Sequence, residues 1–149
     1  MLVAITFIDL DHQIIPDAIS LPGIVIGFGM SFLVPSIDWF NSVMGLLLGG
    51  GLLLAIAWGY EFLAKREGMG GGDIKLLAMI GAFLGWKAIF PILFFAALVG
   101  TIIGVPLMLV KGRGGHLAIP FGPFLSLGAI IYLFWGGQIL HWYFSLWAK

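Results

Sequence analysis

Apolar residues run along this chain in long blocks that short polar stretches separate. The blocks cover about residues 1–8, 17–34, 40–64, 74–84, 88–110 and 120–147. As a helix, the third block would measure about 37 Å, which exceeds the roughly 30 Å of a bilayer's hydrocarbon core. The first block would measure only about 12 Å and cannot cross alone. The pattern predicts six transmembrane helices, the first of them truncated.

Composition agrees with an integral membrane protein. The 149 residues are 61% hydrophobic and 9% charged, with a mean hydropathy of +1.13. A soluble domain carries about a quarter charged residues. Since no internal repeat or linker divides the chain, we expect one all-α transmembrane domain over residues 1–149. Pairs of glycines four residues apart predict close helix packing; they are Gly23/Gly27, Gly45/Gly49, Gly81/Gly85 and Gly100/Gly104.

Charge and ligand chemistry exclude several classes of function. The formal net charge is zero, which argues against a nucleic-acid partner. Cysteine is absent, so the chain has no disulfide and no thiolate metal site. The three histidines, His12, His116 and His141, are too scattered to indicate a metal site. We therefore expect neither a metal nor an organic cofactor. The sequence leaves the oligomeric state open.

The cations predict how the chain is oriented. Alternating spans place five of them on one side, which should be cytoplasmic: Lys65, Arg66, Lys75, Lys111 and Arg113. Only Lys87 and Lys149 fall on the other side, where four tryptophans would form an aromatic belt: Trp39, Trp86, Trp142 and Trp147. The predicted cytoplasmic side also carries two acidic clusters, one at Asp9, Asp11 and Asp17 and the other at Glu67 and Asp73.

A glycine-rich stretch, Gly68 to Gly72, leads directly into Asp73 and an apolar run. Asp73 could simply cap a helix expected from Ile74 to about Leu84. A carboxylate next to segments apolar enough to enter a membrane is costly to desolvate, however. The second acidic cluster also favours a functional role for Asp73. Gly70, Gly71 and Gly72 would let a substrate backbone approach Asp73, although a rigid turn would use them as well.

Two carboxyl groups from separate helices can hydrolyse a peptide bond. One accepts a proton from water while the other, protonated, polarises the carbonyl group, so the pair shares a proton near its working pH. The candidates are Asp73 and a member of the Asp9, Asp11 and Asp17 group. A helix amino terminus would favour ionised Asp73 and a neighbouring carboxylate would disfavour it; the sequence leaves this balance open. Carboxylates at a membrane edge also serve ion or proton transport, which is the alternative class.

Three ordered motifs resemble those of the type IV prepilin peptidases. The stretches run from Ile8 to Asp17, from Gly68 to Leu77 and from Pro120 to Phe124, and Gly70-Gly71-Gly72-Asp73 matches the glycine-any-glycine-aspartate signature of intramembrane aspartyl proteases. The resemblance implies Asp9 and Asp73 as the catalytic pair, with Asp11 and Asp17 in supporting roles. Lys75, close to Asp73 in sequence, is interpreted as an interfacial anchor rather than a catalytic cation.

The resemblance also implies a substrate and a location. Such an enzyme would cleave the short basic leader from type IV prepilins or type II secretion pseudopilins, at the cytoplasmic face of the bacterial inner membrane and surrounded by lipid. Another protease with this signature, such as a preflagellin peptidase or a presenilin-like enzyme, is the alternative within the class. Larger bacterial members carry a cysteine-containing amino-terminal region associated with methylation, which this chain lacks, so the resemblance implies no methyltransferase activity. The short first helix fits either a fragment or a naturally short peptidase.

Overall fold

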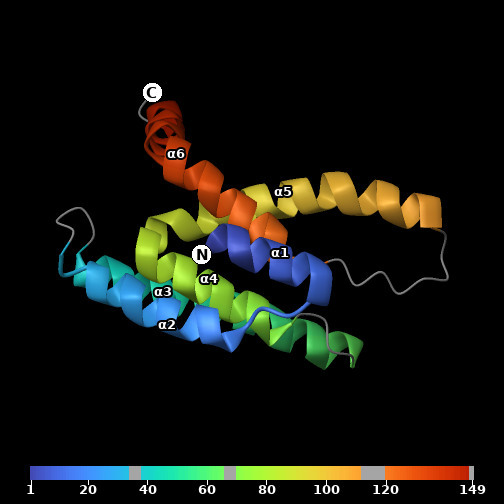
Figure 1. The fold of residues 1–149 in the computed structure, drawn as a ribbon. Coiled ribbons are helices and arrows are strands. Elements are labelled where there is room, and N and C mark those ends of the chain that lie inside the picture. The colour runs from blue at the N-terminus through green and yellow to red at the C-terminus, as the bar shows by residue number, and fades with distance from the viewer. Residues whose placement is uncertain (34–37, 66–69, 112–119, 148–149) are drawn as a thin grey trace.

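The computed structural model describes residues 1–33, 38–65, 70–111 and 120–147, and this part of the chain forms helices without strands. Figure 1 shows six of them. Their bounds are α1 Leu2–His12, α2 Asp17–Met30, α3 Trp39–Ala64, α4 Gly71–Leu84, α5 Trp86–Lys111 and α6 Gly122–Trp147. The all-α class predicted from the hydrophobic pattern is confirmed.

Two helix boundaries differ from the prediction in ways that affect the carboxylates. Helix α1 continues past Ile8 to His12, so Asp9 and Asp11 are helical rather than part of the following loop. It ends at Gln13, whose φ of 53° is left-handed and whose N–H donates to the Asp9 carbonyl oxygen at 2.9 Å. Helix α4 begins at Gly71, three residues before the expected Ile74, and its second residue, Gly72, packs directly against Ile15.

Helix α2 is shorter than predicted and α5 is longer. Helix α2 ends at Met30 instead of continuing to about Val34, and turns follow as far as Leu33. Pro35, the residue after the predicted end of this helix, lies outside the described residues. Helix α5 begins at Trp86 rather than at Ala88, directly after Gly85. Gly85 has a φ of 79°, a conformation that suits glycine, and this turn joins α4 to α5 without a longer loop.

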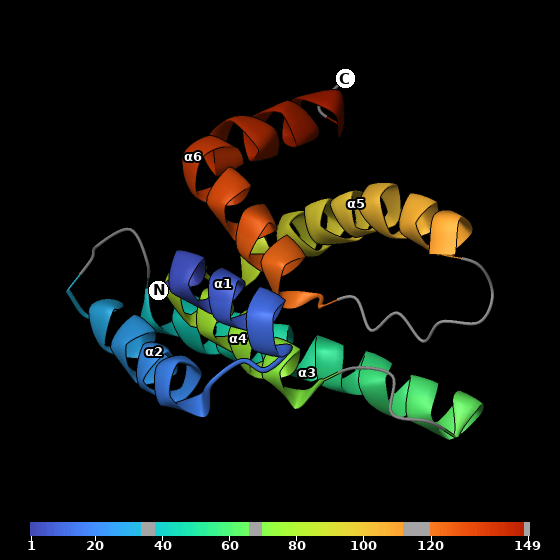
Figure 2. The same cartoon turned by 45° about the vertical axis from the view of Figure 1, so that its right-hand side comes forward.

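Helix α4 forms the centre of the bundle. It contacts α2, α3, α5 and α6, and Figures 1 and 2 show it between α2 and α3 on one side and α1 and α6 on the other. Every residue from Leu76 to Ala82 is buried. A helix that is apolar on all its faces is buried in a protein core or spans a membrane. The apolar run from Leu76 to Leu84 therefore suits the central place of α4, where neighbouring helices cover it.

Glycines allow the backbone of α3 to pack directly against the backbone of α4. A Cβ atom on Gly45 would collide with the carbonyl oxygen of Gly81, and one on Gly49 would lie 2.6 Å from the Leu77 oxygen. On α2, a Cβ at Gly27 would lie 2.8 Å from the ring of Phe83. These contacts confirm the predicted small-residue packing for α2, α3 and α4.

Three of the helices meet the length and hydropathy expected of a membrane span. They cover Trp39–Leu63 in α3, Trp86–Leu107 in α5 and Gly122–Trp142 in α6. Helix α2 is apolar but shorter. Helices α1 and α4 have 11 and 14 residues, which corresponds to about 17 and 21 Å. The structure therefore shows a helical protein with three clear candidate spans rather than the six that were predicted.

Candidate active site

The three motifs of the sequence meet around one apolar side chain, Ile15, in the segment between α1 and α2. A Cβ on Gly72, in the first turn of α4, would lie 2.8 Å from the Cβ of Ile15. A Cβ on Gly122, at the start of α6, would lie 3.2 Å from its Cδ1. Ile15 is 5% exposed. Segments that are far apart in sequence thus converge where α1 ends and α4 and α6 begin (Figure 2).

Asp73 is the third residue of α4 and is almost fully buried, with 9% of its surface exposed. The residue that caps this helix is Gly70, whose carbonyl oxygen accepts a hydrogen bond from the Asp73 N–H at 3.1 Å. No side chain among the described residues makes a capping hydrogen bond there. The interpretation of Asp73 as a simple helix cap is therefore wrong.

Asp9 is buried between α1 and the start of α6. It is 4% exposed, and a Cβ on Gly122 would collide with its Oδ2 and lie 3.1 Å from its Cγ. Gly122 is therefore needed for Asp9 to fit. Oδ2 accepts no hydrogen bond from any described residue. Since a buried polar atom without a partner is costly, this oxygen calls for a functional explanation.

The surroundings of the two carboxyl groups oppose ionisation. Both lie outside the three long apolar spans. Burial raises the pKa of Asp73 to about 7, and the Coulombic effect of nearby Asp9 acts in the same direction. Burial also raises the pKa of Asp9, which the backbone amide of Gly122 partly opposes. Burial and the charge of Asp9 therefore make ionisation of Asp73 less favourable than that of an ordinary aspartate. Such a pair can share one proton near neutral pH.

Lys75 and Asp17 pair with each other. Lys75 Nζ lies 2.6 Å from Asp17 Oδ1, which joins the start of α4 to the start of α2. The side chains are 40% and 57% exposed, so water screens this ion pair. Asp17 is the first residue of α2 and makes no capping hydrogen bond; Pro16 occupies the cap position. Asp17 therefore does not cap α2, and Lys75 is held by this ion pair.

The remaining predicted site residues differ in their surroundings. Asp11 is exposed on α1. A Cβ on Gly70 or Gly71 would meet no atom within 4 Å, whereas one on Gly72 would strike Ile15. The glycine requirement of the motif is therefore steric at Gly72. Glu67, Arg66, Arg113 and His116 lie outside the described residues.

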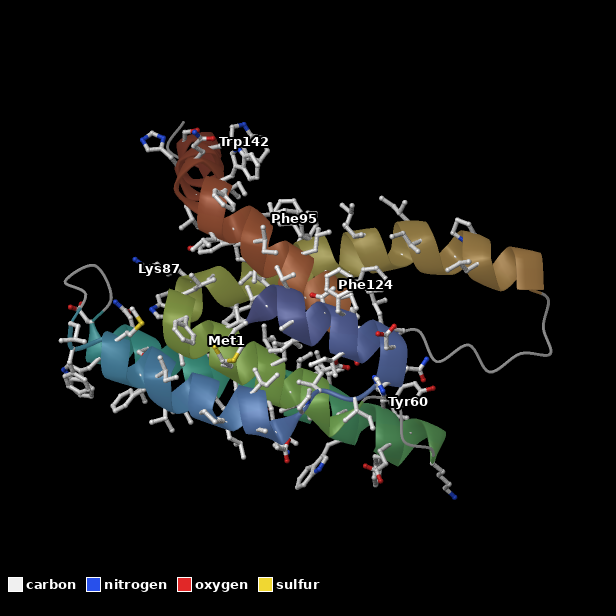
Figure 3. All side chains as sticks on the ribbon, viewed as in Figure 1. Met1, Tyr60, Lys87, Phe95, Phe124 and Trp142 are labelled. Atoms are coloured by element: carbon white, nitrogen blue, oxygen red, sulfur yellow. The ribbon has the colours of Figure 1, made fainter. Side chains whose placement is uncertain are left out.

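The described residues add no metal cluster to the site, and an apolar groove lies apart from it. Within the described ranges, no three His, Cys, Asp or Glu side chains lie together as metal ligands would. A groove of about 620 Å³ lies between the start of α5 and residues 139–142 of α6, and Figure 3 labels Lys87, Phe95 and Trp142 in its lining. Its lining is almost entirely apolar and contains no carboxylate. The groove is therefore separate from the Asp9–Asp73 pair.

Sequence reasoning missed the packing of Ile15 against Gly72 and Gly122 and the burial of Ser126. Gly122 was noticed only as part of the Pro120 to Phe124 motif. Ser126 lies four residues after Gly122, which places both on one face of α6. That spacing was visible in the sequence, but the helix that this face contacts was not.

The fold and the site define a helical membrane protein that buries two carboxyl groups, from different helices, where its central helix begins. The chain belongs to the type IV leader peptidase family, whose family model matches residues 1–105. The matched segment includes Asp9 and Asp73 but not Gly122.

Several relatives are similar over nearly the whole chain. A prepilin leader peptidase/N-methyltransferase of Aeromonas salmonicida is 41% identical over 145 residues, which is 97% of this chain and 50% of the relative. Proteins of the same name from Pseudomonas aeruginosa and Legionella pneumophila are 37% and 36% identical, and the matches cover 49% and 51% of their lengths. The chain spans about half the length of the curated relatives it matches. No solved structure matches it.

Proposed function

We propose that this protein is a membrane aspartyl endopeptidase that removes the leader peptide from type IV prepilins or related pseudopilins. The observation that carries the proposal is the burial of Asp9 and Asp73, from α1 and α4, close enough for one charge to raise the pKa of the other. Membership of the leader peptidase family and the names of the relatives support the substrate class.

In this proposal, Asp73 carries the shared proton and Asp9 is ionised. Asp9 takes a proton from water as the water oxygen attacks the scissile carbonyl carbon, and Asp73 donates its proton to the carbonyl oxygen. Collapse of the tetrahedral intermediate breaks the C–N bond: one hydroxyl group of the intermediate returns a proton to Asp73 as it becomes the carbonyl group, and the proton held by Asp9 passes to the leaving nitrogen. Asp73 suits the acid role because burial and Asp9 both raise its pKa, while Gly122 limits the rise at Asp9.

The proposal includes an orientation in the membrane. Helices α1, α2 and α4 insert beside the three long spans, and the two carboxyl groups lie at the membrane edge, near the end of α1 and the start of α4. This edge faces the cytoplasm, where the basic leader of the substrate remains. Lys65 and Lys75, at the ends of α3 and α4 nearest the site, support that orientation.

The test is cleavage of a leader-bearing prepilin by purified protein in detergent or lipid. Asp9→Asn and Asp73→Asn should each lower the rate by about two orders of magnitude or more, since positioned acid or base groups contribute about 10²–10⁴-fold. The matched control is Asp38→Asn, which changes an exposed aspartate before α3 and should keep the parent rate. Circular dichroism and size exclusion check that each variant folds. A folded variant of Asp9 or Asp73 with full activity would remove that residue from the mechanism.

A further inference from the structure

Two buried side-chain oxygens have no hydrogen-bond partner among the described residues, Asp9 Oδ2 and Ser126 Oγ. Ser126 is 1% exposed and lies on α6. Asp9 belongs to the proposed catalytic pair, whereas nothing so far has assigned a role to Ser126. A buried hydroxyl group that makes no hydrogen bond is costly, so its presence needs a reason.

Ser126 differs from the other serines and threonines in the described part of the chain. Each of those donates a hydrogen bond to a backbone carbonyl oxygen, at 2.6 to 3.3 Å: Thr6, Ser20, Ser31, Ser42, Thr101 and Ser145. Most of these bonds go back to the carbonyl three or four residues earlier, which is the usual partner within a helix. The Ser126 hydroxyl makes no such bond and remains available to another group.

The helical spacing of α6 places Ser126 one turn from a residue that contacts Asp9. Ser126 follows Gly122 by four residues, so the two share one face of the helix. Gly122 contacts Asp9 Oδ2, and α1 packs against α6. The face of α6 that carries Ser126 therefore includes the residue that packs against Asp9.

We propose that Ser126 is a positioning residue for Asp9, whose hydroxyl group donates through one bridging water to Asp9 Oδ2. Ser126 Oγ and Asp9 Oδ2 supply two polar partners for such a water, and a buried water makes about two to four hydrogen bonds. A hydrogen bond to the ionised form of a carboxyl group stabilises that form. Ser126 thus helps Asp9 to act as the base, an inference that rests on the proposed function.

Few other charged groups surround this interface. From α1 they are Asp9 itself and the exposed Asp11 and His12; from α4 they are Asp73 and Lys75, which pairs with Asp17. Among the described side chains of α5, only Lys87 is charged, and it lies at the far end of the bundle beside Trp86. Asp73 is therefore the titrating group whose effect must be separated from that of Ser126.

The test compares Ser126→Ala with the parent in prepilin cleavage over a range of pH. Loss of the hydroxyl should lower kcat about tenfold, leave KM within about twofold, and move the acid limb of the pH profile upward by on the order of one pH unit. The matched control is Ser42→Ala, which removes another fully buried hydroxyl, bonded to Ala82 at the far end of α4. It should leave the pH profile unchanged.

A second readout does not depend on cleavage. Difference infrared spectroscopy can follow protonation of Asp9, with Asp9→Asn identifying its band and Asp73→Asn removing the coupled group. The midpoint for Asp9 should rise in Ser126→Ala and not in Ser42→Ala. An unchanged midpoint and pH profile in folded Ser126→Ala would make Ser126 a simple core residue. A shifted midpoint in a protein whose parent cuts no prepilin would keep the Ser126 contact and overturn the peptidase function instead.

Discussion

Asp73 lies where its ionised form is unfavourable. Its pKa of about 7 compares with an ordinary value of 3.8, and burial is the main cause. Between these two values, the folded protein binds a proton that the unfolded chain releases. The free energy of unfolding contributed by this residue is therefore fully present below about pH 4 and declines as the pH rises toward 7.

Asp73→Asn should reverse this loss, because the amide stays neutral at every pH. Above pH 7 the variant should be more stable than the parent by up to a few kcal/mol, at about 1.4 kcal/mol per pKa unit, and the difference should shrink toward pH 4. Thermal unfolding in detergent over this range measures it. A variant that becomes less stable than the parent as the pH rises would show that ionised Asp73 is stabilised rather than penalised.

At the scale of elements, the packing of α3 against α4 depends on glycines that touch backbone. Gly49, Gly50 and Gly51 are consecutive on α3, yet they meet different surroundings. A Cβ on Gly49 would press on the Leu77 carbonyl oxygen, whereas one on Gly51 would meet no atom within 4 Å. Only the face that contacts α4 needs the small residue.

Gly49→Ala should therefore destabilise the protein, and Gly51→Ala should not. The first forces two packed helices apart, at a cost of about 1–3 kcal/mol that is typical of overpacking. The second adds a methyl group to open space and gains up to about 1 kcal/mol of helix propensity. Thermal unfolding midpoints of the two variants, measured in one detergent, provide the comparison. An equal loss of stability in both variants would show that alanine destabilises α3 itself rather than its contact with α4.

At the scale of the whole molecule, the chain has two ends with different chemistry. The start of α4 carries the carboxyl pair, and Lys75 and Asp17 lie beside it. The far end carries Lys87 beside the Trp86 ring, where α4 passes into α5. Figure 1 shows the central helix running between these ends. A bundle built this way can expose its acidic end on one membrane face only.

Single cysteines can test this orientation, because the chain has none of its own. A membrane-impermeant maleimide should label Lys75→Cys from the cytoplasmic side and Lys87→Cys from the opposite side. Intact spheroplasts and inverted vesicles give the two sides. Labelling of Lys75→Cys in intact spheroplasts would place the carboxyl pair on the outer face and contradict the proposed cleavage of a cytoplasmic leader.

The sequence alone determined the helical membrane class, six helical segments and the two aspartates as candidates. These features are local: hydropathy depends on composition, helices follow from continuous apolar runs, and Gly70 to Asp73 form one short stretch. The helix ends were less predictable. The continuation of α1 to His12 depends on its packing against α6, and the start of α4 at Gly71 leaves Asp73 inside the helix rather than at its cap.

Only the tertiary structure decided which distant residues meet. The burial of Asp9 against Gly122 and the ion pair between Lys75 and Asp17 both join segments that the sequence keeps far apart. Such contacts depend on which helix faces pack together. In an almost uniformly apolar helix, the sequence does not indicate which face packs against the other helices. Helical spacing therefore placed Gly122 and Ser126 on one face, and packing alone brought that face to Asp9.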